Sequence, residues 1–243
     1  MAKTNRKELP EGELSPEVHD SQSSYFLLIN KKWLRTTVVL WSIWFFFAFS
    51  YYGVTLYTTK ILQSDDACFG GVPSITNSTH SSSSPACKPL TQQDYIDILK
   101  TSFSELPGLA FAFLIIDRIG RKKALALQFA MFALANFTFF FCMSRWMVIG
   151  VIFVARALIS GACQSLYVYT PEVYPTNVRA KALGAASMFA RIGSMITPLI
   201  AQVLGDSSLH SSVFVYGLSG VVATIAALLL PFETAGREMG NAR

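Results

Sequence analysis

Six long apolar segments follow one another along the chain, separated by shorter polar or charged stretches. Each is close to the roughly 17–25 residues that an α-helix needs to cross a bilayer. The segments cover residues 36–61, 95–116, 124–143, 146–169, 182–204 and 212–231. A soluble helical core can also contain apolar runs, but so many in one short chain, each flanked by charge, predict an all-α membrane protein with six transmembrane helices.

Composition agrees with a membrane protein and divides the chain into three parts. Hydrophobic residues make up 52% of the chain and charged residues 14%, whereas soluble domains carry about 25% charged residues. We expect a disordered cytoplasmic segment over residues 1–30 and a six-helix transmembrane domain over residues 31–232. The transmembrane domain contains an outer loop at residues 62–94, and the third part is a cytoplasmic tail at residues 233–243.

The basic residues gather on alternate loops, which predicts the orientation of the chain. Loops 117–123 and 171–181 and the tail carry eight Lys and Arg residues, whereas the loops on the other side carry only Lys88 and Arg145. Lys and Arg remain on the cytoplasmic side of a membrane, so both termini are predicted to be cytoplasmic. The net charge of +5 therefore reflects topology, and we expect no nucleic-acid partner.

The outer loop contains three residues that predict modification outside the cytoplasm. Asn77 begins an Asn-Ser-Thr acceptor for N-glycosylation. Cys68 and Cys87 would form a disulfide in an oxidising compartment, and the alternative is an unmodified, flexible loop. Asn136 begins a second formal acceptor, but it falls within a predicted helix and is not expected to be used. The two remaining cysteines, predicted to be packing residues in or near helices, are Cys142 and Cys163.

Three ionisable residues fall near the middle of predicted helices: Glu105, Arg156 and Arg191. Such a group costs roughly 2.5–3.5 kcal/mol in lipid on insertion scales, so it is expected to face a cavity or a partner. One interpretation is solute binding or coupling, with Glu105 carrying a proton and Arg191 attracting an anionic group. The other is structural, with Glu105 paired to one of the arginines.

Polar residues at helical spacing indicate which faces look inward. In the fifth segment they recur every three or four residues. They are Gly184, Ser187, Arg191, Ser194 and Pro198. In the second segment Thr101, Glu105 and Gly108 line up in the same way, and Pro107 is expected to kink the helix. In the first segment Tyr52 is a candidate for solute contact, and simple packing is the alternative.

The predicted cytoplasmic loops carry a second constellation of charges. It consists of Asp117, Arg118, Arg121, Glu172 and Arg179. A network of this kind breaks when the cytoplasmic side opens and would serve as a gate. The alternative is two solvated loops with ion pairs worth roughly 0–1 kcal/mol each. Pro171 and Pro175 are expected to bracket the turn between the fourth and fifth helices.

Motifs for catalysis are missing from the sequence. It has no phosphate-binding loop of the G-x-x-x-x-G-K-[ST] type. The three histidines have no metal-ligand spacing and lie beside no Ser or Cys nucleophile in a plausible site. We expect neither an enzyme nor a bound cofactor or metal.

Three loop motifs resemble the major facilitator superfamily of secondary transporters. They are Asp-Arg-Ile-Gly-Arg-Lys-Lys at 117–123, Pro-Glu-Val-Tyr-Pro-Thr-Asn-Val-Arg-Ala at 171–180 and Pro-Phe-Glu-Thr-Ala-Gly-Arg at 231–237. Ser-Tyr-Tyr-Gly at 50–53 and Ala-Arg-Ile-Gly-Ser-Met-Ile-Thr-Pro at 190–198 are most similar to the synaptic vesicle 2-related and organic ion transporter branch. The resemblance covers residues 25–240 and matches the C-terminal half of such proteins.

This resemblance implies one half of a twelve-helix fold that transports a small organic solute, with an organic ion favoured, by alternating access. Its partners would be the solute, the lipid membrane, and a missing N-terminal half or a second copy, with a proton as a further candidate. The protein would be located in the plasma membrane or in an intracellular vesicle membrane. A non-transporting vesicle-membrane component or partner-binding protein is the alternative function.

Overall fold

The computed structural model describes residues 28, 30–63, 92–176, 178–205 and 209–234, and every regular element among them is a helix. The elements are α3 (Lys31–Gln63), α4 (Gln92–Phe103), α5 (Glu105–Ile119), α6 (Arg121–Phe137), the short 3-10 helix η2 (Thr138–Phe140), α7 (Arg145–Val173), α8 (Arg179–Gly205) and α9 (Leu209–Leu229). Within the described residues, six helices are long and apolar enough to cross a membrane when α4 and α5 are taken together. The prediction of an all-α membrane protein is confirmed.

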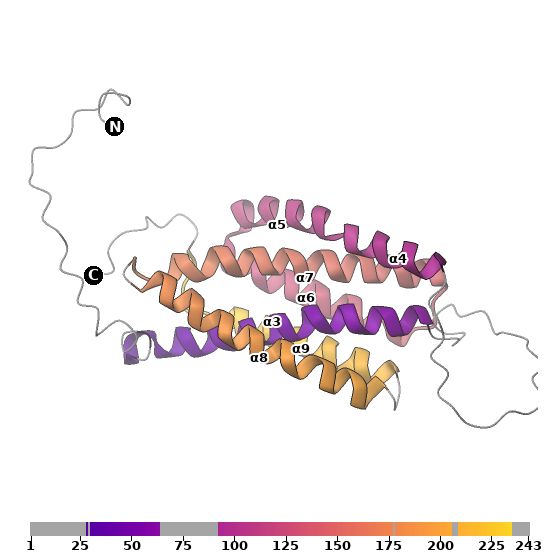
Figure 1. Ribbon diagram of the computed structural model, residues 1–243. Coiled ribbons are helices and arrows are strands. Elements are labelled where there is room, and N and C mark those ends of the chain that lie inside the picture. The colour runs from indigo at the N-terminus through magenta and orange to yellow at the C-terminus, as the bar shows by residue number, and fades with distance from the viewer. Residues whose placement is uncertain (1–27, 29, 64–91, 177, 206–208, 235–243) are drawn as a thin grey trace, which may run out of the picture.

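The helices form one bundle in which they run roughly lengthwise (Figure 1). α3 packs against α8, α9 and α7, whereas α6 packs against α7 and α9 and α5 packs against α7. The core contains large aromatic side chains that are almost fully buried, including Trp44, Tyr57, Phe132 and Tyr216. Large apolar side chains also cover the outside of the bundle, as expected where helices face lipid.

Close helix crossings depend on small residues. A Cβ added to Gly193 of α8 would lie 2.5 Å from the carbonyl oxygen of Phe45 in α3. Gly108 of α5 lies just as tightly against the backbone of Ala157 in α7. Glycines at such crossings let two backbones approach, which is the usual way in which helices gain packing energy within a membrane.

The second spanning segment is interrupted near its middle. α4 ends at Phe103 and α5 begins at Glu105, so the kink expected from Pro107 is a break in the regular helix. Proline has no N–H to donate to the carbonyl of Phe103, and the helix loses a hydrogen bond there.

Two predicted helix ends were wrong. α7 runs through Pro171 to Val173, so this proline does not stop the helix, and the chain leaves the helix at Tyr174 before Pro175. The third segment was expected to reach Met143, but α6 ends at Phe137 and η2 at Phe140. Residues 1–27, most of the expected outer loop and residues 235–243 lie outside the described part of the chain.

Candidate functional site

A polar cavity of about 470 Å³ lies between α3, α5, α7 and α8. Its lining brings together side chains from four separate predicted segments. They include Tyr51, Tyr52, Glu105, Cys163, Gln164, Ser187, Arg191 and Ser194. The structure therefore places the three central members of the α8 polar stripe and the candidate residues Tyr52 and Glu105 around one space.

Glu105 is held by two helices at once. Its Oε1 accepts a hydrogen bond from Arg156 Nη2 in α7 at 3.1 Å and another from the hydroxyl of Tyr51 in α3 at 3.1 Å. The Arg156 side chain is 11% exposed and is not part of the cavity lining, whereas the Glu105 side chain is 34% exposed and lines the cavity. The sequence left open which arginine pairs with Glu105, and the structure pairs it with Arg156.

Arg191 lies at the cavity without an acidic partner among the described residues. Its neighbours Ser187 and Ser194 each donate a hydroxyl hydrogen bond of 2.8 Å to a carbonyl of their own helix. Because Glu105 and Arg156 neutralise one another, Arg191 leaves the cavity with one uncompensated positive charge. Tyr52 is also exposed, and its ring centroid lies 5.4 Å from that of Tyr51 in an edge-on arrangement.

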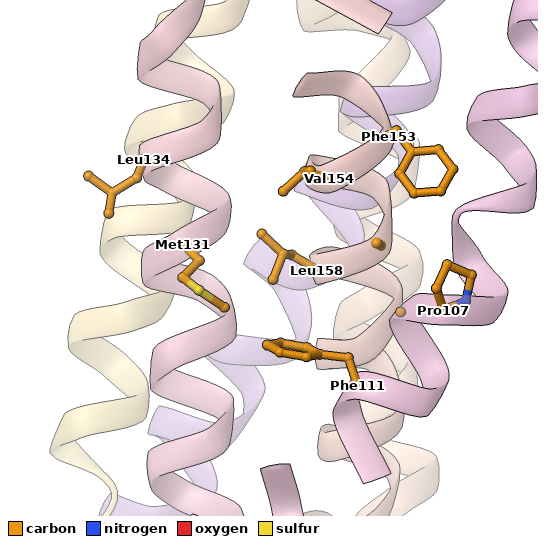
Figure 2. Close-up of a pocket in the computed structure, with 9 residues that line it drawn as sticks. Pro107, Phe111, Met131, Leu134, Phe153, Val154 and Leu158 are labelled. Atoms are coloured by element: carbon orange, nitrogen blue, oxygen red, sulfur yellow. The ribbon is translucent and has the colours of Figure 1, made fainter. Parts of the chain in front are cut away.

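A second cavity, also of about 470 Å³, lies between α5, α6 and α7 and is almost entirely apolar. Figure 2 shows Phe111 of α5, Met131 of α6, and Phe153 and Leu158 of α7 around this space. Its lining contains no ionisable side chain. It therefore has nothing with which to orient a polar solute, and the cavity beside Arg191 is the better candidate site.

The predicted cytoplasmic charge cluster is assembled only in part. Arg121 Nε, at the start of α6, lies 3.3 Å from Glu172 Oε2, near the end of α7. Both of these atoms are buried and neither forms a hydrogen bond, so the two charges are close without hydrogen-bond geometry. Nε of Arg179 is likewise buried and without a hydrogen bond. Asp117 and Arg118 are exposed and form no ion pair within the described residues.

Glu233 is a member of this cluster to which the sequence assigned no role. Its Oε1 accepts a hydrogen bond of 3.2 Å from the backbone N–H of Lys122, in the first turn of α6. The turn before this helix contains Gly120 at a φ of 96°, and a Cβ there would lie 2.9 Å from the Glu233 carboxyl carbon. The first turn of α6 has no acidic residue of its own, so the far end of the chain supplies the negative charge that a helix N-terminus favours.

The predictions for the cysteines and glycosylation sites have different outcomes. Cys142 is disulfide-bonded, so its expected role as a packing residue was wrong, whereas Cys163 is free. Asn136 is fully buried, and its Oδ1 accepts a 2.8 Å hydrogen bond from Tyr57, which leaves its acceptor motif inaccessible. Three predicted residues lie outside the described part of the chain: Cys68, Asn77 and Cys87.

Comparison with known proteins settles the family. The sequence profile described as the Major Facilitator Superfamily matches residues 101–242, which is more than half of the chain. The chain belongs to the major facilitator superfamily. Its resemblance to this superfamily is confirmed, and it is a multi-pass membrane protein of a transporter family.

Curated relatives in the superfamily resemble nearly the whole chain. “Putative transporter svop-1” of Caenorhabditis elegans is 46% identical over 98% of this chain and 45% of the relative. “Synaptic vesicle 2-related protein” of Pongo abelii is 42% identical over 98% of this chain and 43% of the relative. “Putative transporter SVOPL” of Homo sapiens is 33% identical over 98% of this chain and 50% of the relative. The chain thus spans about half the length of these superfamily members.

Proposed function

We propose that the chain forms one wall of an alternating-access pathway for a small organic anion or zwitterion. The observation that carries this proposal is the charge balance of the polar cavity. Glu105 is neutralised by Arg156, and Arg191 lines the same space without an acidic partner in the described residues. A guanidinium in such a place attracts a carboxylate or phosphate, with which it forms two parallel hydrogen bonds.

The remaining lining suits an organic molecule rather than a bare inorganic ion. Tyr51, Tyr52, Trp44 and Phe47 contribute aromatic surface, and Gln164 contributes an amide. Cavities for small organic molecules combine aromatic and apolar surface with placed polar groups, and this cavity offers both. Tyr52 in particular offers an exposed ring in the same cavity as Glu105 and Arg191, which supports its assignment as a solute contact.

An open cavity also favours transport over the alternative of a non-transporting membrane component. A sealed, apolar bundle with every charge paired would have favoured that alternative. In the described residues Arg191 is exposed and the cavity is polar, which supports a surface made to meet a solute. The family name and the relatives’ names support transport in general, and the solute class is our proposal.

The opposite wall would come from a second six-helix half. The chain covers 43–50% of the length of these relatives, and we propose that an N-terminal half or a second copy of this chain packs against the face with the cavity. A proton is a further candidate for coupling. A protonated Glu105 would lose its ion pair with Arg156, so coupling would require this pair to open and close during transport.

The charges at the other end of the bundle would form a cytoplasmic gate. We propose that Arg121, Glu172 and Arg179, with Asp117 and Arg118 nearby, hold this end closed and separate when it opens. Arg121 and Glu172 join α6 to α7 without a hydrogen bond. Both side chains are partly exposed, at 23% and 20%, so water can solvate the two charges when this end opens, which suits a gate.

Glycosylation tests the orientation on which this gate depends. We expect Asn77 to carry an N-linked glycan, because basic residues place the loop around it outside the cytoplasm. Glycosidase treatment should then increase the gel mobility of the chain, and Asn77→Gln should abolish this shift. A chain without the shift, in which a cysteine introduced by Asn77→Cys reacts with a membrane-impermeant maleimide only after the membrane is permeabilised, would reverse the proposed orientation and the side of the gate.

Solute-dependent thermal stabilisation tests the proposed function directly. The purified chain, alone and co-expressed with an N-terminal half from a relative, is measured against organic anions, zwitterions, cations and sugars. A ligand at one hundred times its dissociation constant stabilises the folded state by about 2.7 kcal/mol. We expect carboxylates or zwitterions to raise the midpoint and cations to leave it unchanged. Stabilisation by cations alone, or no response from a folded complex of both halves, would contradict the proposal.

A further inference from the structure

The inner face of α4 is polar, which is unusual for half of a spanning segment. Asp94, Asp97 and Thr101 are its buried residues, with exposed fractions of 6%, 1% and 0%. The opposite face is apolar and exposed, with Leu99 at 68% and Phe103 at 66%. α4 is therefore attached to the bundle through polar and ionic contacts, whereas its apolar surface faces away from the bundle.

One arginine at the start of α7 clamps both aspartates. Arg145 Nη2 donates to Asp94 Oδ1 at 2.7 Å and to Asp97 Oδ2 at 3.0 Å. Lys100 of α4 lies 3.3 Å from the other oxygen of Asp97, and its ammonium group also lies 5.6 Å from the centre of the Trp146 ring. These contacts join α4 to the first turn of α7 at the end where the chain enters both helices.

The opposite end of α4 has the features of a hinge. The hydroxyl of Ser104 donates to the carbonyl of Thr101 at 2.6 Å, and the Ser104 backbone N–H bonds to the same carbonyl at 3.3 Å. These bonds occupy the carbonyl that a continuous helix would offer to Glu105. Pro107 cannot donate to Phe103, so the ladder between α4 and α5 is weakened on both sides of Ser104.

We propose that α4 is a hinged arm beside the solute cavity, with Arg145 on Asp94 and Asp97 as its latch and Ser104 as its pivot. Its role in admitting a solute rests on the proposed function of the cavity. α4 contacts α3 and α7, which are two of the helices that line the cavity. Figure 1 shows α4 and α5 following one another along the bundle, so an arm that moves at their junction leaves α5 in place.

The pivot at Ser104 lies next to the cavity, so movement of α4 and binding of a solute would affect one another. Glu105 is the first residue after Ser104, and its carboxylate is held by Tyr51 of α3 and Arg156 of α7. A solute that binds Tyr51 or Arg156 in place of Glu105 would free the Glu105 carboxylate and loosen the junction between α4 and α5. The polar inner face of α4 also suits an opening movement. Its carboxylates can be hydrated once they leave Arg145, whereas exposing an apolar inner face to water would cost free energy.

Tryptophan quenching of a fluorophore measures the separation of α4 and α7. A bimane label on Lys100→Cys, in a Cys163→Ser background, takes the place of the side chain that lies over Trp146. The same background without Lys100→Cys supplies the labelling blank. We expect strong quenching in the latched chain, and Arg145→Gln should raise the dequenched fraction roughly ten-fold, as the loss of charge-assisted hydrogen bonds predicts.

Two further variants separate the latch from the hinge. Lys123→Gln removes an exposed charge at the other end of the bundle and should leave quenching unchanged. Adding Pro107→Ala to Arg145→Gln restores the missing N–H and should return most of the quenching. Unchanged quenching in Arg145→Gln would overturn the latch, and equal dequenching in the double variant would overturn the hinge.

Folding and function are kept apart in this design. If Arg145→Gln yields no folded chain, Asp97→Asn removes one of the two acceptors and should give a smaller rise, whose absence would overturn the latch. All measurements are made without solute, in lipid nanodiscs. If α4 moves in these measurements but no solute stabilises the chain, the hinge is supported. Only the proposed function of the cavity is then contradicted.

Discussion

Replacement of Arg191 by glutamine is expected to weaken the binding of an anionic solute by about ten-fold or more. A hydrogen bond to a charged group contributes roughly 1.5–3 kcal/mol, and the variant loses both the charge and the paired donors. Since Arg191 is exposed at the cavity and has no ion-pair partner in the described residues, its replacement leaves no buried charge behind. Folding should therefore be nearly unaffected. The measurement is the concentration of solute needed for half-maximal thermal stabilisation.

A matched control separates the cavity from charge in general. Lys123 is also an exposed cation, and it lies in the first turn of α6, outside the lining of the cavity. Lys123→Gln removes the same net charge and should leave the solute affinity unchanged. Equal affinity in the Arg191→Gln and parent proteins would contradict the assignment of Arg191. An equal loss in both variants would show that the effect comes from the net charge alone.

Replacement of Gly108 by alanine is expected to lower the free energy of unfolding by about 1–3 kcal/mol, the usual cost of overpacking a close contact. The new methyl group would overlap the carbonyl oxygen of Ala157 in the facing helix, and neither backbone can move without separating α5 from α7. The same crossing is tight from the other side, where a Cβ on Gly161 would lie 2.9 Å from the Gly108 oxygen. Chemical denaturation in detergent measures the change.

Gly150→Ala provides the control for this packing prediction. Gly150 is an exposed residue of α7, and a Cβ there would meet nothing within 4 Å. Alanine is the better helix former by roughly 0.5–1 kcal/mol, so this variant should be as stable as the parent or slightly more stable. If Gly108→Ala were equally well tolerated, α5 would have room to move away from α7, and the crossing would be looser than the structure shows.

The loops and helices of this protein were predictable because their signals are local. Hydrophobic length depends on consecutive residues, and it predicted six spanning segments correctly within the described residues. The side on which Lys and Arg gather is also a local signal, and the orientation drawn from it stays a prediction. The small and polar residues Ser187, Arg191 and Ser194 share a helix face by spacing alone, and the structure places all three at the cavity. The break near Ser104 followed in the same way from the missing N–H of Pro107.

Contacts between distant residues were not predictable from the sequence. Arg156 and Arg191 were equivalent partners for Glu105, because the depth of a residue in a membrane does not say which neighbouring helix it faces. Only the packing of α5 against α7 brings Arg156 within 3.1 Å of Glu105, whereas Arg191 of α8 lines the same cavity without this contact. The clamp of Arg145 on Asp94 and Asp97 was missed for the same reason.

The sequence by itself determined that the chain crosses a membrane as six helices of the major facilitator type, since apolar length, charge bias and loop motifs are all contained in short stretches. The tertiary structure alone decided that Glu105 pairs with Arg156 and that Arg191 lines the cavity without an acidic partner among the described residues. It also decided that Glu233, from the far end of the chain, holds the first turn of α6. The physical reason is that an ion pair or helix cap depends on the distance between atoms, and this distance is set by how the helices pack.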